Sequence, residues 1–167
     1  FGRTVLMPWM GKEAFAAFAN VAKPIHDWLA VPFAVGLVLM MVAWIKESLP
    51  KGYDFTWLKM GGGYFDRSKH PPAGFVNAGE KLWYWLVVLV GLAVSGSGLV
   101  LLLHVFDQSR ATMELAHVVH TLGALLPILG SLGHIYIGTL GMEGAFDSIS
   151  QGYVDANWAK EHHDLWY

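Results

Sequence analysis

Three histidines, His26, His120 and His134, lie at the start of, or inside, strongly apolar stretches of the sequence. Ionisable residues are costly inside a membrane helix and usually have a function there. His120 and His134 are fourteen residues apart, which on a helix turns them through about 1400°, only about 40° short of four full turns. Both side chains would therefore share one face, about 21 Å apart along the axis. Since neutral imidazole nitrogen binds iron well, this spacing favours two b haems, one near each surface of a bilayer.

A low-spin b haem takes two axial imidazoles, which usually come from facing helices. His26 begins the first apolar stretch and His120 lies early in the third, so with one antiparallel helix between them the two would lie at similar depth. They can form one haem site near the extracytoplasmic surface. Neither of two other histidines is a good ligand partner for His134. His104 ends the antiparallel second stretch, on the opposite side of the membrane, and His70 lies in a loop beside two prolines. We therefore expect the partner of His134 on a helix that precedes this sequence.

Other residues of the apolar stretches have simpler interpretations. His117 lies about 100° from His134 in helical projection, so it fits the ligand face less well. We interpret His117 and His104 as hydrogen-bonding contacts between helices. The small residues Gly91 and 95–98 (SGSG) would let helix backbones approach closely. They would also leave room for a flat porphyrin, although packing alone is the better explanation.

The composition is that of a membrane protein. Of 167 residues, 54% are hydrophobic and 14% are charged, whereas a soluble domain has about 25% charged residues. Three stretches, about 26–45, 82–104 and 115–140, reach the roughly 20 residues that a spanning helix needs. An isolated apolar segment can satisfy its backbone in lipid only as a helix. The sequence therefore predicts an all-α integral membrane helical bundle with three transmembrane helices.

Several other classes are excluded or disfavoured. The sequence has no cysteine, which rules out disulfides, iron–sulfur clusters and covalently attached haem on this chain. The net charge is −2 and there is no basic run, so nothing indicates nucleic-acid binding. We find no inverted repeat or broken helix of the kind expected of a transporter.

The regions around the spans differ in character. We predict an interfacial segment with the end of a preceding helix over 1–25, a transmembrane haem-binding bundle over 26–140 and a polar, partly helical tail over 141–167. The connection 46–81 carries six basic residues, whereas 105–113 carries one. Because basic residues concentrate on the cytoplasmic side, the long connection and the C-terminal tail are expected to be cytoplasmic.

The chain resembles the cytochrome b (gamma) subunit of membrane-bound respiratory formate dehydrogenase. The resemblance is carried by residues 75–85 (FVNAGEKLWYW), 117–136 (HVVHTLGALLPILGSLGHIY) and 158–167 (WAKEHHDLWY), and more weakly by 23–33 (KPIHDWLAVPF). It implies a four-helix subunit of the inner (cytoplasmic) membrane with two b haems. The first of the four helices is expected to be absent here. The partners implied are an iron–sulfur subunit and a molybdenum- or tungsten-containing catalytic subunit, and such complexes can form higher oligomers.

The resemblance also assigns roles to the histidines. His26 and His120 would bind the haem nearer the periplasm, and His134 would bind the haem nearer the cytoplasm. The family's second ligand for the latter lies on its first helix, so either that helix is missing from this chain or the second haem is absent or differently ligated. His162 and His163 match the family's tail, and we expect them at an interface or on the surface rather than as ligands.

The family's quinone site corresponds here to Asn77, Gly79 and Glu80. Asn77 could donate a hydrogen bond to a quinone carbonyl, Gly79 would let the ring approach the backbone, and Glu80 could relay a proton. Glu80 stands where the family often has glutamine. An equally good interpretation is that Asn77 caps the second helix while Glu80, three residues on, completes a capping box. Both interpretations can hold together.

The function implied is that of a di-haem b-type cytochrome that carries electrons from a periplasmic formate dehydrogenase iron–sulfur subunit to quinone, without catalysing formate oxidation itself. One alternative is the b-type cytochrome subunit of a nickel–iron hydrogenase or of another periplasmic oxidoreductase. Another is a haem-free membrane anchor. The haem interpretation predicts that quinone coupling is lost when His120 is replaced by alanine, whereas the anchor interpretation predicts that it survives.

Overall fold

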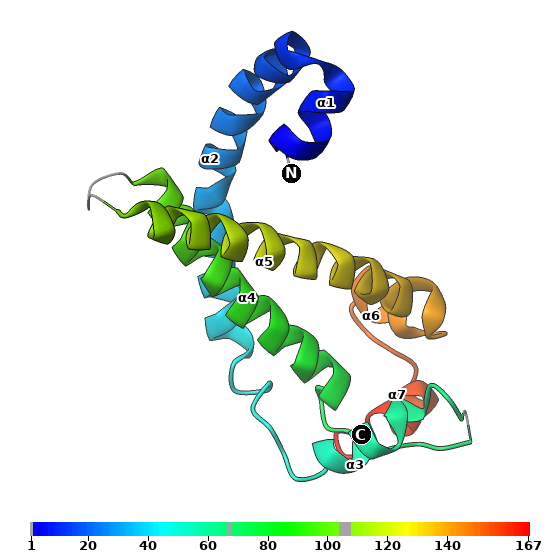
Figure 1. Cartoon of the computed structure of the whole chain (residues 1–167). Coiled ribbons are helices and arrows are strands. Elements are labelled where there is room, and N and C mark those ends of the chain that lie inside the picture. Colours follow the sequence, from blue (N-terminus) through cyan, green and yellow to red (C-terminus); the bar gives the residue numbers. More distant parts are fainter. Residues whose placement is uncertain (1, 67, 104–107) are drawn as a thin grey trace. The chain divides into compact units, whose positions relative to one another are not determined.

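The computed structural model describes residues 2–66, 68–103 and 108–167 of the chain. The described residues form helices joined by turns and loops, without a β-strand among them (Figure 1). In chain order the helices are η1 (Gly2–Leu6), α1 (Met7–Met10), α2 (Lys12–Trp44), α3 (Asp54–Lys59), η2 (Gly61–Gly63), α4 (Ala78–Leu102), α5 (Arg110–Tyr136), η3 (Ile137–Gly141), α6 (Ala145–Ser150) and α7 (Ala156–His162). The predicted all-α class is confirmed.

Three helices are long and apolar enough to cross a membrane: α2, α4, and α5 with its continuation η3. They correspond to the three predicted spans. The helix α2 begins at Lys12 rather than near His26, so it takes in more than half of the segment predicted as interfacial. Pro24 and Pro32 lie inside α2. Proline is tolerated within membrane helices, because neighbouring groups can satisfy the freed backbone carbonyl.

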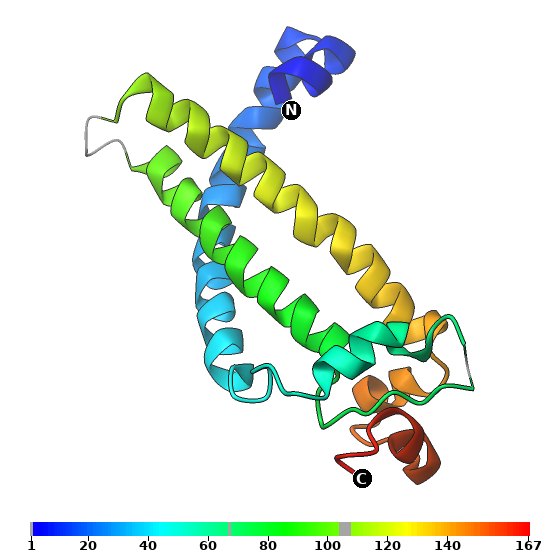
Figure 2. The ribbon, with the colours of Figure 1, turned by 60° about the horizontal axis from the view of Figure 1, so that its bottom comes forward.

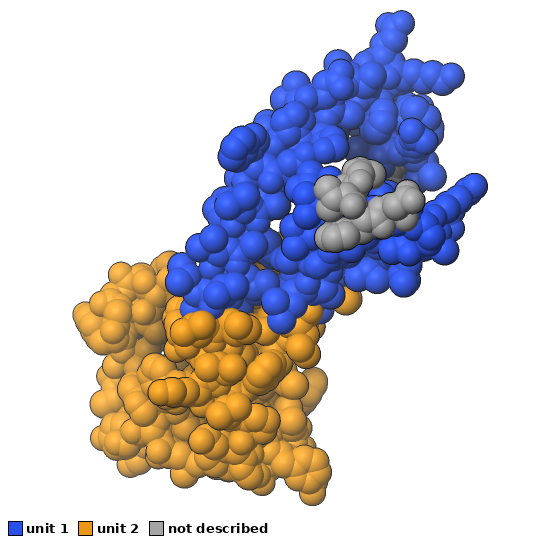
Figure 3. Space-filling model, turned by 90° about the vertical axis from the view of Figure 1, so that its left-hand side faces the viewer, with its two compact units in different colours: residues 1–40, 90–125 blue, residues 41–89, 126–167 orange. Residues whose placement is uncertain are grey.

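The chain divides into two compact units, coloured separately in Figure 3. Unit 1 contains residues 1–40 and 90–125, and unit 2 contains residues 41–89 and 126–167. Each long helix therefore contributes one segment to each unit.

Small residues allow the helix segments of unit 1 to pack closely. A Cβ added at Gly91 of α4 would lie 2.8 Å from Cδ1 of Leu37, the buried residue of α2. A Cβ at Gly123 of α5 would lie 2.8 Å from Cγ2 of Val94 on α4. For Gly91, the prediction of close packing is confirmed.

Unit 2 is organised around a buried ion pair at the beginning of α4. Nζ of Lys81 lies 2.8 and 2.9 Å from the two carboxylate oxygens of Asp54 on α3, and both side chains are largely buried. The Asp54 carboxylate also accepts a hydrogen bond of 2.6 Å from the backbone N–H of Lys51. A buried charge is tolerated only when it is paired in this way. The pair fixes α3 to the start of α4.

Two aromatic side chains of α4 tie that helix to the end of α2 and the turn after it. The hydroxyl of Tyr84 donates to the carbonyl of Met41 at 2.8 Å, and the indole N–H of Trp85 donates to the carbonyl of Ser48 at 2.9 Å. Buried tyrosine and tryptophan usually need such partners.

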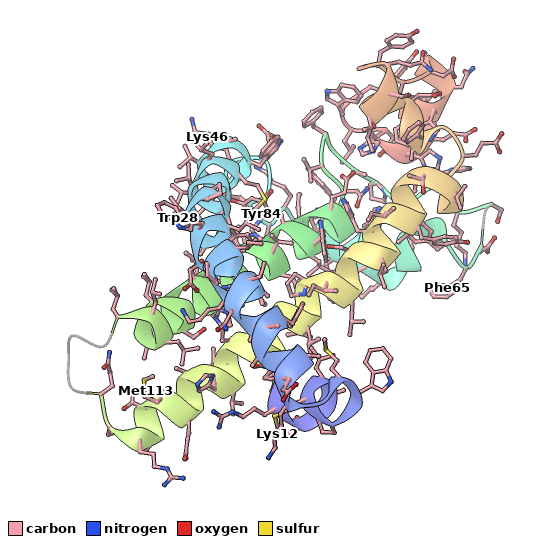
Figure 4. All side chains as sticks on the ribbon, turned by 90° about the horizontal axis from the view of Figure 1, so that it is seen from above. Lys12, Trp28, Lys46, Phe65, Tyr84 and Met113 are labelled. Atoms are coloured by element: carbon pink, nitrogen blue, oxygen red, sulfur yellow. The ribbon has the colours of Figure 1, made fainter. Side chains whose placement is uncertain are left out.

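Large apolar side chains cover the outside of the helices, as the stick view shows (Figure 4). Trp28 on α2 is an example, since 78% of its surface is exposed. Exposed apolar area on this scale would be unfavourable in water. It suits helices whose outer faces contact lipid.

Candidate functional site

His120 of α5 is oriented by α4 within unit 1. Its Nδ1 lies 3.0 Å from the carbonyl oxygen of Val94 and 3.3 Å from Oγ of Ser97. Because a carbonyl can only accept, Nδ1 carries the proton and Nε2 keeps its lone pair. Histidines that bind metal usually donate their other ring N–H to such a partner. The imidazole is therefore held in the tautomer that an iron ligand requires.

His26 of α2 faces His120. The two ring centroids are 5.8 Å apart and the ring planes lie at 64° to each other. Two imidazoles on one metal ion, with metal–nitrogen bonds of about 2.0–2.1 Å as for zinc, have nitrogens about 4 Å apart and ring centres about 6 Å apart. The observed separation fits a shared iron. The structure therefore brings the rings of His26 and His120 together, and haem binding by the pair stays a prediction.

The small residues of α4 leave room for the His120 ring. A Cβ at Gly98 would lie 3.0 Å from Cε1 of His120 and 3.4 Å from its Nδ1, so a side chain at this position would crowd the imidazole. Ser97 donates its own hydroxyl to the carbonyl of Ala93 at 2.7 Å. Oγ of Ser95 is buried and has no hydrogen-bond partner among the described residues.

His134 lies in unit 2 and has a different environment. Its ring stacks on the indole of Trp83, with centroids 5.0 Å apart and planes at 16°. Trp83 fits there because Gly130 carries no side chain, since a Cβ at Gly130 would lie 2.5 Å from Cζ3 of the indole. Among the described ring contacts of His134 there is no second imidazole. The structure therefore does not show a histidine pair at this position.

Three other histidines were considered in the sequence, and the structure describes two of them. His117 is exposed on α5 and takes part in no hydrogen bond among the described residues, so its interpretation as a hydrogen-bonding contact stays a prediction. His104 lies outside the described residues. His70 lies on the loop before α4 and is exposed.

The predicted capping box at the start of α4 is confirmed. Oδ1 of Asn77 accepts a hydrogen bond of 3.0 Å from the backbone N–H of Glu80, and a Glu80 carboxylate oxygen accepts one of 2.8 Å from the backbone N–H of Asn77. The Asn77 side chain uses only its oxygen in this motif. Its amide nitrogen contacts no acceptor among the described residues and remains able to donate.

Gly79 permits a close approach, but of a side chain. A Cβ at Gly79 would lie 2.8 Å from Cη2 of Trp57, so the indole of Trp57 occupies the space that the absent side chain leaves. Trp57 is buried together with Ala73 and Ala78. The close approach at Gly79 is thus already used within unit 2.

Asn77 lines a cavity of about 540 Å³ in unit 2. Aromatic residues from three segments, Trp57, Tyr64 and Trp158, form part of its wall, and His162 adds an imidazole. Ligand sites commonly have this size and this combination of aromatic walls with a few polar groups. Gly79 and Glu80 are not among the described residues that line it. Burial raises the pKa of the Tyr64 phenol, and the charge of Glu80 raises it further.

The C-terminal tail lies near the segment that leads into α4 (Figure 2) and is hydrogen-bonded to it. The backbone N–H of Ala73 donates to the Asp164 carboxylate at 2.8 Å, and the carbonyl of Ala73 accepts from the N–H of Leu165 at 3.0 Å. Nδ1 of His163 donates to the carbonyl of Gly74 at 2.7 Å. His163 is only 5% exposed. The expectation of an interface or surface position is therefore wrong for His163, because it is buried against its own chain.

His162 differs from its neighbour. It is half-buried and lies against Trp158, with ring centroids 4.8 Å apart. The indole N–H of Trp158 donates to the carbonyl of Glu143 at 2.8 Å, which fixes the ring beneath the imidazole. Burial lowers the pKa of the His162 imidazole, while the neighbouring Glu161 carboxylate opposes that shift. Sequence reasoning did not assign either tail histidine to a site, because His163 bonds to Gly74, 89 residues away, and the cavity that His162 lines is formed by segments distant in the sequence.

The chain has relatives among known proteins. The chain is 24% identical over 152 residues to the formate dehydrogenase cytochrome b556 subunit of Haemophilus influenzae. The aligned region covers 89% of this chain and 63% of that protein, which is less than two thirds of its length. The chain is also 24% identical to the cytochrome b556(Fdn) subunit of the nitrate-inducible formate dehydrogenase of Escherichia coli, covering 70% of its length. The cytochrome b556(fdo) subunit from the same organism is 24% identical, with 71% covered.

The match to a protein family extends over most of the chain. Residues 4–151 fit the family described as prokaryotic cytochrome b561, and this range includes His26, His120, His134 and Asn77. Together with three helices that can cross a membrane, this match shows a multi-pass membrane protein of the b-type cytochrome class. The chain belongs to the prokaryotic cytochrome b561 family.

Proposed function

We propose that this chain is the haem-carrying membrane subunit through which a formate dehydrogenase passes electrons to quinone. The observation that carries the proposal is the facing pair His26 and His120, with Nδ1 of His120 bonded to the carbonyl of Val94. A cofactor-free anchor has no need of two imidazoles at this separation with one tautomer selected. The names of the three formate dehydrogenase subunits to which the chain is similar support the choice of electron donor.

His26 and His120 would hold one haem through their ring nitrogens. His134 would supply one ligand to a second haem, and its other ligand would come from outside the described residues. Bound b haem supplies one-electron transfer at a reduction potential that its ligands tune. Trp83 stacks on His134 and fixes the orientation of the imidazole ring. The chain's residues thus orient His120 and His134.

Quinone would be reduced beside Asn77. The amide nitrogen of Asn77 is left over from the capping box and can donate to a quinone carbonyl. Glu80 holds the Asn77 backbone in place, and Gly79 admits the Trp57 indole that forms one wall of the cavity. Quinol formation takes two electrons and two protons, so this site needs both a haem and a proton source.

The partners would be an iron–sulfur subunit and a catalytic subunit with molybdenum or tungsten, both on the periplasmic side of the inner membrane. The basic connection 46–81 and the tail 141–167 would then face the cytoplasm. Asn77 belongs to the basic connection, so it would lie on the side where cytoplasmic protons are available.

The b-type cytochrome subunit of a nickel–iron hydrogenase is the second candidate. It would use the same histidines in the same helices, so the two functions differ only in the electron donor. Identifying the catalytic subunit that co-purifies with the chain, by mass spectrometry, decides between them.

The test of the proposal is a reduced-minus-oxidised spectrum of the purified membrane complex, with haem extracted and counted per copy of this chain. We expect b-type haem in the wild type, and loss of one haem in both H26A and H120A. Formate should reduce the haem, and added quinone should reoxidise it. A complex without haem, or an H120A variant that keeps full haem content and quinone reduction, would overturn the proposal.

A further inference from the structure

The cavity of unit 2 brings two distant parts of the chain together. Asn77 lines it from the start of α4, and His162 and Trp158 line it from α7 in the C-terminal tail. Hydrogen bonds between the segment before Asn77 and the residues His163, Asp164 and Leu165 hold this wall in place. The tail is therefore a built part of the cavity.

The cavity also carries groups that exchange protons. Besides His162, its titratable lining residues are Tyr64, Lys69, His70, Glu143 and Glu161. Histidine is the side chain whose ordinary pKa lies closest to neutral pH, so it can both take up and release a proton there. A quinone bound at Asn77 would accept two protons, and Glu80, the residue first considered for this role, is engaged in the capping box.

His162 is better placed for this role than His70. Its ring is half-buried, lies against the fixed indole of Trp158 and lines the cavity with Asn77. His70 also lines the cavity, but it is exposed on a loop and has no hydrogen bond among the described residues. The charges facing His162 come from Glu161 beside it and from the two imidazoles of His163 and His70.

We propose that His162 carries protons from the water of the cavity to the quinone held at Asn77. This inference rests on the proposed quinone reduction. Bound haem would supply the two electrons, and each quinone oxygen takes one proton to give the quinol. The protonated imidazole of His162 breaks an N–H bond as an O–H bond forms on the quinone, and the neutral ring then takes a new proton from water. Burial, which lowers the pKa of His162, makes its protonated form a better donor.

The test uses the whole membrane complex with H162Q, which keeps a polar side chain of similar length but cannot carry a proton. The matched control is H70Q, on the exposed histidine of the same cavity. We expect haem content and haem reduction by the electron donor to be unchanged in both variants. The rate of quinol formation should fall roughly 10- to 100-fold in H162Q. A positioned proton donor typically contributes about 100- to 10,000-fold, and the expected loss is smaller because water in the cavity can replace His162 in part. The rate should stay near wild type in H70Q.

Two further measurements keep the test independent of folding and of turnover. In H162A, added imidazole should restore part of the lost rate, which a purely structural histidine would not allow. Quenching of tryptophan fluorescence by a quinone analogue should show the same dissociation constant in H162Q as in the wild type, because His162 delivers protons and does not anchor the ring. Trp57 and Trp158 line the cavity and report on its occupation.

The outcomes separate the two proposals. A wild-type complex that reduces quinone while H162Q keeps its full rate, or an H162A variant that imidazole does not rescue, overturns the role of His162 and leaves the proposed function intact. A wild-type complex whose reduced haem is not reoxidised by quinone overturns both. An equal loss of rate in H70Q and H162Q also overturns the assignment to His162.

Discussion

Asn77 offers a substitution that separates a helix cap from a quinone ligand. Its Oδ1 accepts the Glu80 N–H at 3.0 Å, whereas its amide nitrogen is free of acceptors among the described residues. N77S keeps an oxygen that caps a helix about as well as asparagine does. It loses the amide donor, and its short hydroxyl cannot reach the same point in the cavity. N77A loses both the cap and the donor.

The two losses have different magnitudes in different assays. N77A should lower the free energy of unfolding by about 1 kcal/mol, within the 0.5–2 kcal/mol that a lost N-cap costs, and N77S by no more than a few tenths. Loss of one neutral hydrogen bond to quinone, about 0.5–1.5 kcal/mol, should raise the KM for quinone by about 2- to 13-fold in both variants. Stability therefore distinguishes the two substitutions, whereas quinone affinity does not.

The assays are unfolding by denaturing detergent, followed by circular dichroism, and steady-state quinone reduction by the intact complex. E80Q is the control, since glutamine also completes a capping box at this position. It should match the wild type in both assays, and a lost rate in E80Q would return the proton relay to Glu80. A wild-type KM in N77S, together with a raised KM only in the less stable N77A, would show that Asn77 is a cap and nothing more.

Three other perturbations test the ion pair, the haem site and the tail. K81M leaves the carboxylate of Asp54 buried without its partner and should lower the free energy of unfolding by about 3–5 kcal/mol, and a K81M/D54N double variant should recover part of this loss in the same detergent titration. G98V should crowd the imidazole of His120, because a Cβ at position 98 would lie 3.0 Å from Cε1 of that ring. It should therefore lower the haem content measured by a pyridine haemochrome assay. Because burial lowers the pKa of His162, the unfolded tail binds a proton more readily than the folded tail as the pH falls below about 6.5. The tail should therefore lose stability in acid, and amide-exchange protection of α7 that is unchanged between pH 7.5 and 5.5 would contradict this.

The predictable part of the fold follows from the bilayer. Apolar length alone placed three spanning helices, and the structure has them at α2, α4 and α5. The start of α2 could not be placed in the same way, because residues 1–25 are less apolar than the spans. In the structure α2 begins at Lys12 and continues through Pro24, since one missing N–H does not end a membrane helix.

The histidine pair was predictable for a related reason. In a membrane, distance along a spanning helix is also depth, so two residues far apart in the sequence can be matched by depth alone. This places His26 opposite His120 without knowledge of the packing. What depth cannot give is the orientation of the ring, which depends on the carbonyl of Val94 and on the missing side chain of Gly98.

Outside the spanning helices, position in the sequence does not give depth in the membrane. Contacts there become harder to predict as the separation of the residues along the chain grows. The capping box joins Asn77 and Glu80, only three residues apart, and its sequence pattern was sufficient. The tail contacts join Ala73 to Asp164 and Gly74 to His163, and no local pattern connects such residues. The histidines of the tail were therefore expected at an interface or on the surface, although one is buried against its own chain and the other lines the cavity. In a protein of this class, residues in polar tails are the ones whose roles only a structure can bring into view, and His162 is where that difference can be measured.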